Sequence, residues 1–383
     1  MAVPLPQTAP LRVERLTVSV YRAPIDRPVR TTFGAMTDRP AVVVCAESDG
    51  AIGYGEIWCN FPTCGAEHRA RLLKSVFEPW VTGTEWTSPA EAFAELSART
   101  RLLALQAGEP GPIAQVIAGI DTALWDLAAR QAGVPLWRLL GGTRERVPAY
   151  ASGLNPDGAV AQAQEARAAG FRAFKLKIGF GREVDLGNLE GLRRRLGPDV
   201  AIAVDANQAW ELEEALTMSR ALSRHAPLWL EEPLAADRPI EEWQRLAEAS
   251  PIPLAAGENL RGDAAFDAAI ASGALRVVQP DLAKWGGITA GLPLAWRIGA
   301  AGLRYCPHFL GGGIGLLASA HLLAAAGGDG LLEIDSNPNP LREGLAAPFP
   351  PLEDGCFVLS EAPGLGVAPG PDALRFAVPP AAQ

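Results

Sequence analysis

The chain has few cysteines, few histidines and no long apolar run. Its five cysteines are odd in number and lack the paired spacing of a metal site, so a reducing compartment fits better than a disulfide framework. No run of about 18 uncharged apolar residues marks a membrane span. The first residues, Met1-Ala-Val-Pro-Leu-Pro, contain no basic segment followed by an apolar one, unlike a signal peptide. We therefore expect a cytoplasmic protein without a membrane partner.

An excess of basic residues is also missing. The chain has 34 Lys and Arg against 43 Asp and Glu, a formal net charge of −9. Phosphate binding needs clustered Lys and Arg, so nucleic acid is not expected as a partner. This charge does not exclude a small anionic substrate, because a bound cation can reverse the field of a site.

The composition that is present is that of an ordinary globular protein, with 383 residues, 48% apolar and 20% charged. This length accommodates a barrel of about 250 residues and a smaller domain. Residues from about 11 to 57 alternate like strands, with a turn at Asp49-Gly50, which predicts an antiparallel meander. Residues from about 66 to 134 have helical periodicity, most clearly from Ile113 to Arg130.

After Val147, short apolar runs alternate with amphipathic ones such as 211–224 and 262–272. Strands alternating with helices are typical of parallel βαβ units, and seven or eight in succession predict a barrel. The last 40 residues are rich in Pro and Gly and leave this repeat, so we expect them to return to the N-terminal domain. The predicted strands cover residues 148–152, 173–178, 201–205, 228–231, 253–256, 275–279, 303–306 and 331–334.

The predicted fold class is therefore α/β. An α+β capping domain spans residues 1–140, and a TIM-like (β/α)₇β barrel spans 141–340. The C-terminal segment, 341–383, completes the capping domain.

Charged residues recur at a nearly constant interval in the barrel region. They are 28, 26, 27, 23, 27 and 25 residues apart, about the length of one strand, one helix and two loops. Each therefore marks the carboxyl end of a strand, and in a barrel these ends share one face, where the active sites of such enzymes lie. The series is Lys177, Asp205, Glu231, Glu258, Asp281, His308 and Glu333.

Three acids of this series, Asp205, Glu231 and Glu258, each follow a strongly apolar strand. Carboxylates are rarely buried unless they are paired or bound to metal, and three together would repel one another without a cation between them. Hard oxygen ligands select Mg²⁺, with Mn²⁺ as a substitute. The alternative for any single acid is a helix N-cap.

Lys175 and Lys177 lie two residues apart in a predicted strand, so both should face the same side. Two like charges that are partly desolvated should lower the pKa of one lysine towards the range of a general base. The alternative is a pair of solvated surface lysines.

Asp281 and His308 end adjacent predicted strands and form a possible dyad. A carboxylate behind an imidazole fixes its tautomer and raises the basicity of the outer nitrogen. The alternative for His308 is a structural histidine. Lys284, three residues after Asp281, is either a partner of the site or a surface charge.

Together these segments resemble the enolase superfamily, specifically its mandelate racemase group, over nearly the whole chain. Two finer segments, 174–181 and 332–340, resemble sugar-acid lactone cycloisomerases within that group. The motifs that carry the resemblance are Lys175-Leu-Lys177, Val204-Asp-Ala-Asn207, Glu231-Glu-Pro233, Gly257-Glu-Asn259, Pro280-Asp281, Pro307-His308, the segment 120–126 and Pro363-Gly-Leu-Gly366.

The resemblance implies a capping domain over a (β/α)₇β barrel, with Mg²⁺ held by Asp205, Glu231 and Glu258. It implies removal of the proton α to a carboxylate and a metal-stabilised enediolate, chemistry known for the superfamily. Lys177 would be the base on one face and His308, backed by Asp281, on the other. Lys175 would assist electrostatically, and Glu333 would hydrogen-bond the substrate carboxylate.

We expect a sugar acid or its lactone as the small anionic substrate, and a homo-oligomer. Racemisation, dehydration and lactone isomerisation all begin with the same proton transfer, so the sequence leaves them open. Substrate choice should lie in two capping loops, Pro28 to Met36 and Trp58 to Cys64. A catalytically silent binding or structural barrel is the alternative, although none of the expected ligands and bases is lost. An amidohydrolase would need a His-x-His motif, which is absent.

Overall fold

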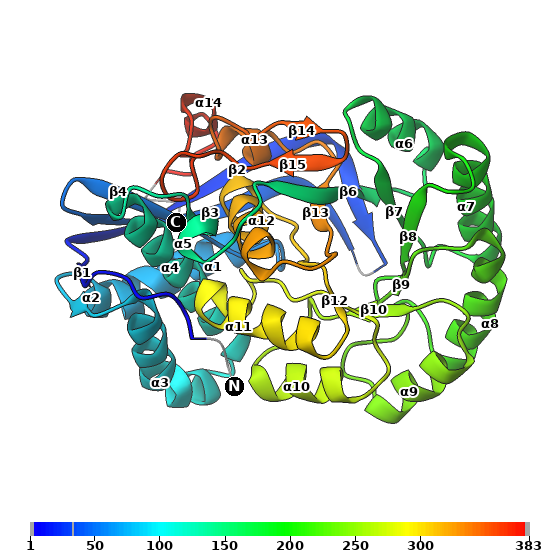
Figure 1. The fold of residues 1–383 in the computed structure, drawn as a ribbon, viewed down its shortest axis with the longest axis horizontal. Helices are drawn as coiled ribbons and strands as arrows, with labels where there is room; N and C mark the ends of the chain where they lie inside the picture. The colour runs from blue at the N-terminus through cyan, green and yellow to red at the C-terminus, as the bar shows by residue number, and fades with distance from the viewer. Residues whose placement is uncertain (1–3, 33, 380–383) are drawn as a thin grey trace.

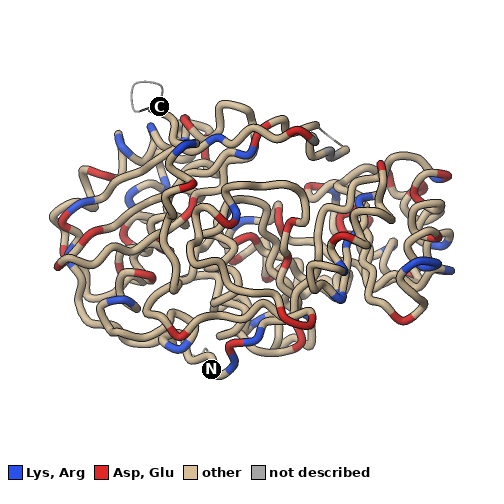
Figure 2. Tube along the Cα trace, turned by 90° about the horizontal axis from the view of Figure 1, so that it is seen from above, with Lys and Arg blue, Asp and Glu red and all other residues tan. Residues whose placement is uncertain are grey.

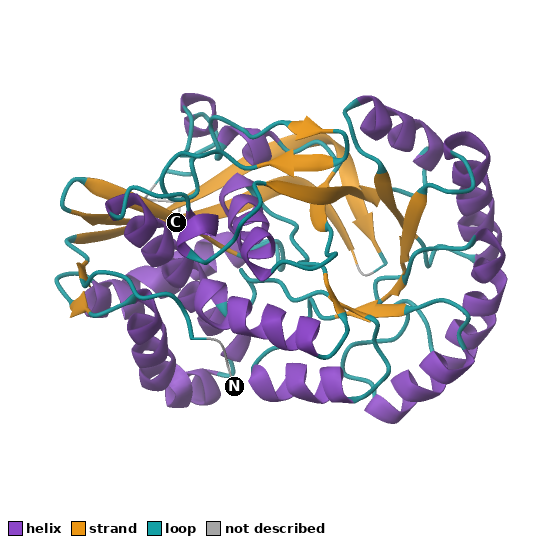
Figure 3. Cartoon of the chain, in the orientation of Figure 1, coloured by secondary structure: helices purple, strands orange, loops and turns teal. Residues whose placement is uncertain are grey.

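The computed structural model describes residues 4–32 and 34–379 (Figure 1). An N-terminal α+β region lies beside a curved sheet of parallel strands, and helices cover the outer side of that sheet (Figure 3). Both parts of the predicted architecture are therefore present.

The N-terminal region is built on the predicted antiparallel meander. Strands β2 (Arg15–Thr31), β3 (Gly34–Ser48) and β4 (Ala51–Ile57) form one antiparallel sheet. The turn between β3 and β4 has positive φ at Asp49 (49°) and Gly50 (75°), as a tight hairpin turn requires.

Helix α4 (Pro110–Gln131) packs against this sheet and is buried along almost its whole length. Gly53 and Gly55 of β4 allow the close approach, since a Cβ on either would collide with the α4 backbone. The remaining elements of this region are β1 (Leu11–Arg12), α1 (Gly65–Leu72), the π-helical η1 (Leu73–Phe77), α2 (Glu78–Val81), β5 (Glu85–Trp86), α3 (Pro89–Ala107) and α5 (Leu136–Leu139).

All eight predicted barrel strands are present, and they are parallel. Their hydrogen-bonded order is β13-β6-β7-β8-β9-β10-β11-β12, and no backbone ladder joins β12 to β13 within the described residues. The residues that adjoin these two strands are in contact, because the amide of Leu331, just before β13, donates to Sγ of Cys306, just after β12, at 3.4 Å. The strands are β6 (Arg146–Leu154), β7 (Ala173–Lys177), β8 (Ala201–Asp205), β9 (Leu230–Glu231), β10 (Leu254–Ala256), β11 (Val277–Val278), β12 (Arg304–Tyr305) and β13 (Leu332–Asp335).

The helices that follow the strands form an arc around the sheet (Figure 1). Their apolar faces and the outer faces of the strands make the main core. The helices are α6 (Ala159–Ala168), α7 (Arg182–Leu196), α8 (Leu212–Leu222) with the 3₁₀ turn η2 (Ser223–His225), α9 (Ile240–Ala249), α10 (Asp263–Ala271), α11 (Gly287–Ala300) and α12 (Gly313–Ala326).

A small separate cluster fills the inner side of the curved sheet. Tyr150 and Trp229 meet edge to face, with ring centroids 5.5 Å apart, among small inward-facing residues of the other strands. This packed layer closes the interior, so charged residues further along the strands stand at the carboxyl-end mouth.

The C-terminal segment contacts both parts. Strand β15 (Cys356–Val358) pairs antiparallel with the start of β6. Ala377 bridges to Tyr21 of β2, which agrees with the expected return to the N-terminal region. The other elements of the segment are α13 (Pro340–Gly344), β14 (Leu352–Glu353) and α14 (Pro371–Leu374).

Two buried carboxylates of the N-terminal region cap helices of the barrel. Asp121 of α4 accepts from the amides of Ile288 (2.7 Å) and Thr289 (2.9 Å) at the start of α11. Glu56 of β4 accepts from the amides of Gly312 and Gly315 at the start of α12. Burial raises the pKa of both carboxyl groups to about 7, although the hydrogen bonds they accept lower it.

None of the helices in residues 4–32 and 34–379 combines the length and apolar character needed to cross a bilayer.

Acidic and basic positions are interspersed along the chain (Figure 2).

Replacing Asp121 by Ala should destabilise the fold by about 2–4 kcal/mol, because the α11 amides would be left buried without an acceptor. Urea denaturation measures this loss. Ser88→Ala, which removes the exposed N-cap of α3, is the matched control and should cost only about 1 kcal/mol. Equal losses of unfolding free energy in the two variants would contradict a larger contribution of Asp121, which caps α11 from the N-terminal region.

The same carboxyl groups should make stability depend on pH. Their folded pKa lies above the unfolded values of 3.8 and 4.5, so their contribution is complete below those values and is lost as pH rises through about 7. We expect the unfolding free energy of the wild type to fall more between pH 5 and pH 8 than that of the Glu56→Gln, Asp121→Asn double variant. Parallel pH profiles would refute this.

Candidate active site at the barrel mouth

The strand register brings the predicted residues of β7, β8 and β9 to one level. Lys177 pairs with Asp205 across β7 and β8, and Asp205 pairs with Glu231 across β8 and β9. Lys175 and Lys177 both reach Asp205 Oδ2, at 3.6 and 2.6 Å. The prediction that the two lysines face the same side is confirmed, and the alternative of two surface lysines is wrong.

Lys175 is fully buried and joins carboxylates from different strands. Its Nζ lies 2.6 Å from Glu231 Oε1 and 2.7 Å from Glu333 Oε1, and it stands 5.5 Å from the centre of the Tyr150 ring. Burial lowers the pKa of Lys175, but Glu231 and Glu333 outweigh that effect and the net pKa is raised well above its usual value. Lys175 is therefore a fixed positive charge.

Lys177 also carries a stable charge in this arrangement. Its Nζ lies 2.6 Å from Asp205 Oδ2 and 2.7 Å from Asn207 Oδ1. Burial lowers its pKa most strongly and Lys175 lowers it further, but the charge and hydrogen bond of Asp205 together with the charge of Glu231 raise the pKa overall. The prediction that one of the two lysines has a lowered pKa is therefore wrong in this arrangement, because the pKa of both is raised and, at Lys177, the charge of Asp205 has a larger effect than that of Lys175.

The three carboxylates predicted to hold Mg²⁺ stand at neighbouring strand ends, but each turns towards its own partner. Asp205 binds Lys177, Glu231 binds Lys175, and Glu258 Oε2 lies 2.5 Å from His308 Nε2. Over residues 4–32 and 34–379, no three His, Cys, Asp or Glu side chains are close enough together to hold a metal ion as they stand. Metal binding would therefore need side-chain rotation.

The charge of the mouth nevertheless fits a divalent cation. With every group ionised, six carboxylates meet three ammonium groups and one imidazolium, which leaves two negative charges in excess. Burial raises the pKa of Glu232 well above its usual range, and a cation beside it would favour its ionised form. Glu232 Oε2 is buried without a hydrogen-bond partner among the described residues. The acids are Asp205, Glu231, Glu232, Glu258, Asp281 and Glu333, and the bases are Lys175, Lys177, Lys284 and His308.

His308 and Asp281 form the expected pair, with Nδ1 2.8 Å from Asp281 Oδ2. Asp281 is itself fixed, because its Oδ1 accepts from the amides of Ala283 (2.9 Å) and Lys284 (3.2 Å). Burial lowers the pKa of His308, but Glu258 and the other nearby carboxylates raise it well above the usual value overall. The arrangement directs Nε2 away from Asp281 and towards Glu258.

Glu333 lies deep in the same cluster. Its Oε1 accepts from Ser152 Oγ and contacts Lys175, and its Oε2 accepts from the Phe309 amide at 3.2 Å. Ser152 was missed by sequence analysis, although a polar residue at the end of the apolar strand β6 was the available signal. Lys284 is not a surface charge, since only 11% of its side chain is exposed.

Loops of the N-terminal region touch the mouth. Thr32 Oγ1 donates to the Asn207 carbonyl at 2.6 Å, and Asn60 Nδ2 donates to the Leu310 carbonyl at 2.6 Å. Arg39 forms a buried ion pair with Asp335 at 2.5 Å. Both predicted substrate loops therefore reach the barrel, although residue 33 of the first lies outside the described residues.

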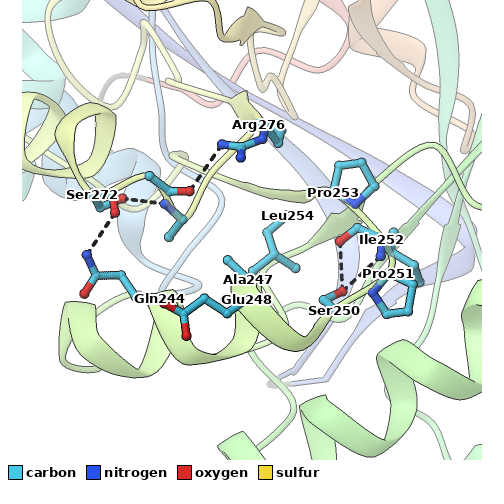
Figure 4. A pocket seen from close by; sticks show the side chains of 12 residues that line it. Gln244, Ala247, Glu248, Ser250, Pro251, Ile252, Pro253, Leu254, Ser272 and Arg276 are labelled. Carbon is cyan, nitrogen blue, oxygen red and sulfur yellow. Dashed lines mark hydrogen bonds between the residues drawn. The ribbon is translucent and has the colours of Figure 1, made fainter.

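A large pocket at the other end of the sheet is not the reaction site. It has a volume of about 590 Å³ and is lined by α9, by residues 250–254 up to the start of β10, and by residues 272–274 and Arg276 before β11 (Figure 4). Those segments mark the amino ends of the strands, whereas the charged cluster stands at the carboxyl ends.

Sequence relatives identify the family. Residues 15–141 match the mandelate racemase / muconate lactonizing enzyme N-terminal domain, and residues 158–373 match the enolase C-terminal domain-like family. D-galactarolactone cycloisomerase of Agrobacterium fabrum is 32% identical over 375 residues, covering 93% of this chain and 96% of the relative. Arabinonate dehydratase of Saccharolobus solfataricus is 30% identical over 342 residues, covering 86% and 89%.

Solved structures agree with this result. A mandelate racemase/muconate lactonizing enzyme of Bordetella bronchiseptica superimposes with a TM-score of 0.90 at 52% identity, covering 96% of this chain and 99% of that one. A racemase of Streptomyces coelicolor with bound magnesium gives a TM-score of 0.85 at 29% identity, covering 96% and 100%. The chain therefore belongs to the mandelate racemase / muconate lactonizing enzyme family of the enolase superfamily, and it is an isomerase or lyase.

Proposed function

We propose that this enzyme removes the proton α to the carboxylate of a sugar acid or its lactone, with Mg²⁺ held by Asp205, Glu231 and Glu258. One observation carries the proposal: two proton-transfer groups, Lys177 and His308, flank one carboxylate cluster. Lys177 ends β7 and His308 follows β12, with β8 to β11 between them on one side of the sheet order.

The relatives support the substrate class. Their names specify a galactarolactone and an arabinonate, both derived from sugar acids, and their reactions are a cycloisomerisation and a dehydration. A related racemase structure contains magnesium, which supports the choice of metal. Carboxylate oxygens are the ligands that Mg²⁺ prefers.

Bound Mg²⁺ would polarise the substrate carboxylate and so acidify the α-proton. Lys177 would transfer a proton on one face of the α-carbon. His308 would act on the other face, with Asp281 holding its ring in position through Nδ1. Lys175 and Glu333 would hold the substrate carboxylate, Lys175 as the charge and Glu333 as the hydrogen-bond partner.

The outcome depends on the substrate. Two bases on opposite faces permit racemisation, and a base opposite an acid permits loss of water or opening of a lactone. The silent-barrel alternative has no supporting observation, since all the expected residues are retained at one mouth.

Other properties stay predictions: the domain boundaries near residues 140 and 340, Mn²⁺ as a substitute metal, a homo-oligomer and a cytoplasmic location.

Adding Mg²⁺ to chelator-treated protein should raise its melting temperature, because the ion binds the folded state alone. At a hundredfold excess over the dissociation constant, the gain is about 2.7 kcal/mol. Asp205→Asn should abolish most of the shift. Glu248→Gln, in the pocket of Figure 4, removes a distant carboxylate and should keep it. A wild type without any shift at millimolar Mg²⁺, or one that turns over fully without metal, would contradict the site.

Isotope exchange should distinguish the roles of the two proposed bases, Lys177 and His308. Lys177→Ala and His308→Asn should each lower turnover by about 10²–10⁴-fold, since each removes one proton-transfer group. In a racemase, His308→Asn should still exchange the α-proton of one enantiomer with deuterium through Lys177, without interconverting the pair. Deuterium incorporation followed by NMR measures this.

In a dehydratase or cycloisomerase, one residue should control exchange and the other departure of the leaving group. The assignment fails if the Lys177→Ala, His308→Asn double variant keeps wild-type exchange and turnover. Wild-type turnover in Asp281→Asn alone would contradict only the role of Asp281 as the partner of His308, and His308 would remain a candidate base.

A further inference from the structure

The chain uses lysine sparingly, and most of its lysines stand at the barrel mouth. Of 34 basic residues only four are lysine: Lys74, Lys175, Lys177 and Lys284. Lys74 is exposed on η1, whereas the other three belong to the charged cluster. The first two of these three have proposed roles, and Lys284 has none so far.

Lys284 lies between the barrel and the capping region. Its Nζ is 3.2 Å from Asn259 Oδ1 and 3.6 Å from Glu258 Oε2. The same Nζ stands 4.8 Å from the centre of the Trp58 ring, within the range of a cation–π contact. Its backbone is held as well, because its amide donates to Asp281.

Trp58 directly follows β4 and so belongs to the capping loop 58–64. Its indole Nε1 is buried and has no hydrogen-bond partner among the described residues. A buried donor without an acceptor is costly, and indole nitrogen can only donate. An oxygen atom of a bound molecule would satisfy it, and a sugar acid carries several such oxygens.

Lys284 and His308 contact the same atom, Glu258 Oε2, at 3.6 and 2.5 Å. Trp58 therefore stacks on a group next to the proposed reaction centre. We infer that Lys284 is a positioning residue that holds Trp58 over the mouth, and that the Trp58 indole N–H donates to a substrate oxygen. The substrate contact rests on the proposed function, whereas the stacking contact does not.

We call the contact between Lys284 and Trp58 the clamp. The loop 58–64 allows the strength of this contact to be measured without substrate. Cys59 follows Trp58 and is 3% exposed, while Cys64 at the end of the loop is exposed. Asn60 ties the loop to the barrel through Leu310, so Cys59 lies between two attachments. If the contact at Trp58 is lost, Cys59 should become accessible more often.

We would alkylate the intact metal-free protein with iodoacetamide and follow Cys59 by peptide mass spectrometry, with Cys64 as the internal reference. Lys284→Met removes the charge and keeps the stem, and should accelerate labelling of Cys59 by about 2- to 30-fold, the range of a cation–π contact. Lys284→Arg keeps a cation and should restore slow labelling. Lys74→Met is the surface control and should match the wild type.

Trp58→Phe tests the two roles of Trp58 separately, because it keeps an aromatic ring and removes the indole N–H. The ring still covers the ammonium, so labelling of Cys59 should stay within about twofold of the wild type. With a substrate of the proposed class, KM should rise by about 2- to 13-fold, the worth of one hydrogen bond, while kcat stays unchanged. Lys284→Met should raise KM in the same way, and Lys284→Arg should recover it.

Wild-type labelling of Cys59 in a folded Lys284→Met protein would overturn the clamp. Trp58→Phe with unchanged KM would overturn the indole contact. A lower kcat at constant KM in Lys284→Met would show that Lys284 acts on the chemistry and would also overturn the inference. Failure of the proposed function leaves the labelling results intact, because they need neither metal nor substrate.

Discussion

The organisation of the mouth depends on one buried cation, Lys175. It has no exposure to solvent and bridges Glu231 of β9 and Glu333 of β13, with Asp205 of β8 3.6 Å away. Without it, these carboxylates would face one another in a low-dielectric interior, at a cost of several kcal/mol. Because the residues come from separate strands, the ion pairs form only when the barrel register is correct.

The capping region depends on a similar use of buried charge. Asp121 and Glu56 satisfy the amides at the start of α11 and α12, and these helices flank the strand that leads to His308. Helix N-termini attract carboxylates, so each contact compensates part of the cost of burial. The caps thus fix the capping sheet against the barrel, and the loops from that sheet then reach the mouth.

Strand positions could be predicted because apolar runs and charged strand ends recur at a constant interval, and all eight strands were found. The directions of the side chains could not be predicted, because they depend on neighbouring residues from distant parts of the sequence. Glu231 turns to Lys175 instead of towards Glu258. Nearby carboxylates raise the pKa of both Lys175 and Lys177, whereas a lowered pKa was predicted for one of them. Trp58 lies more than 200 residues from Lys284, so no periodicity could have paired them.

A contrast between rigid strand ends and loosely attached capping loops offers a physical reason why one family accommodates several substrates. The proposed bases and ligands stand at strand ends that the core and Lys175 hold rigidly, whereas the capping loops attach through a few contacts such as Trp58–Lys284 and Asn60–Leu310. A change in the loops alters what the mouth admits without moving the bases. A cycloisomerase and a dehydratase are both similar to most of this chain, so relatives with different reactions share its overall architecture. We therefore expect substrate identity to depend on the capping loops and proton transfer to depend on the barrel.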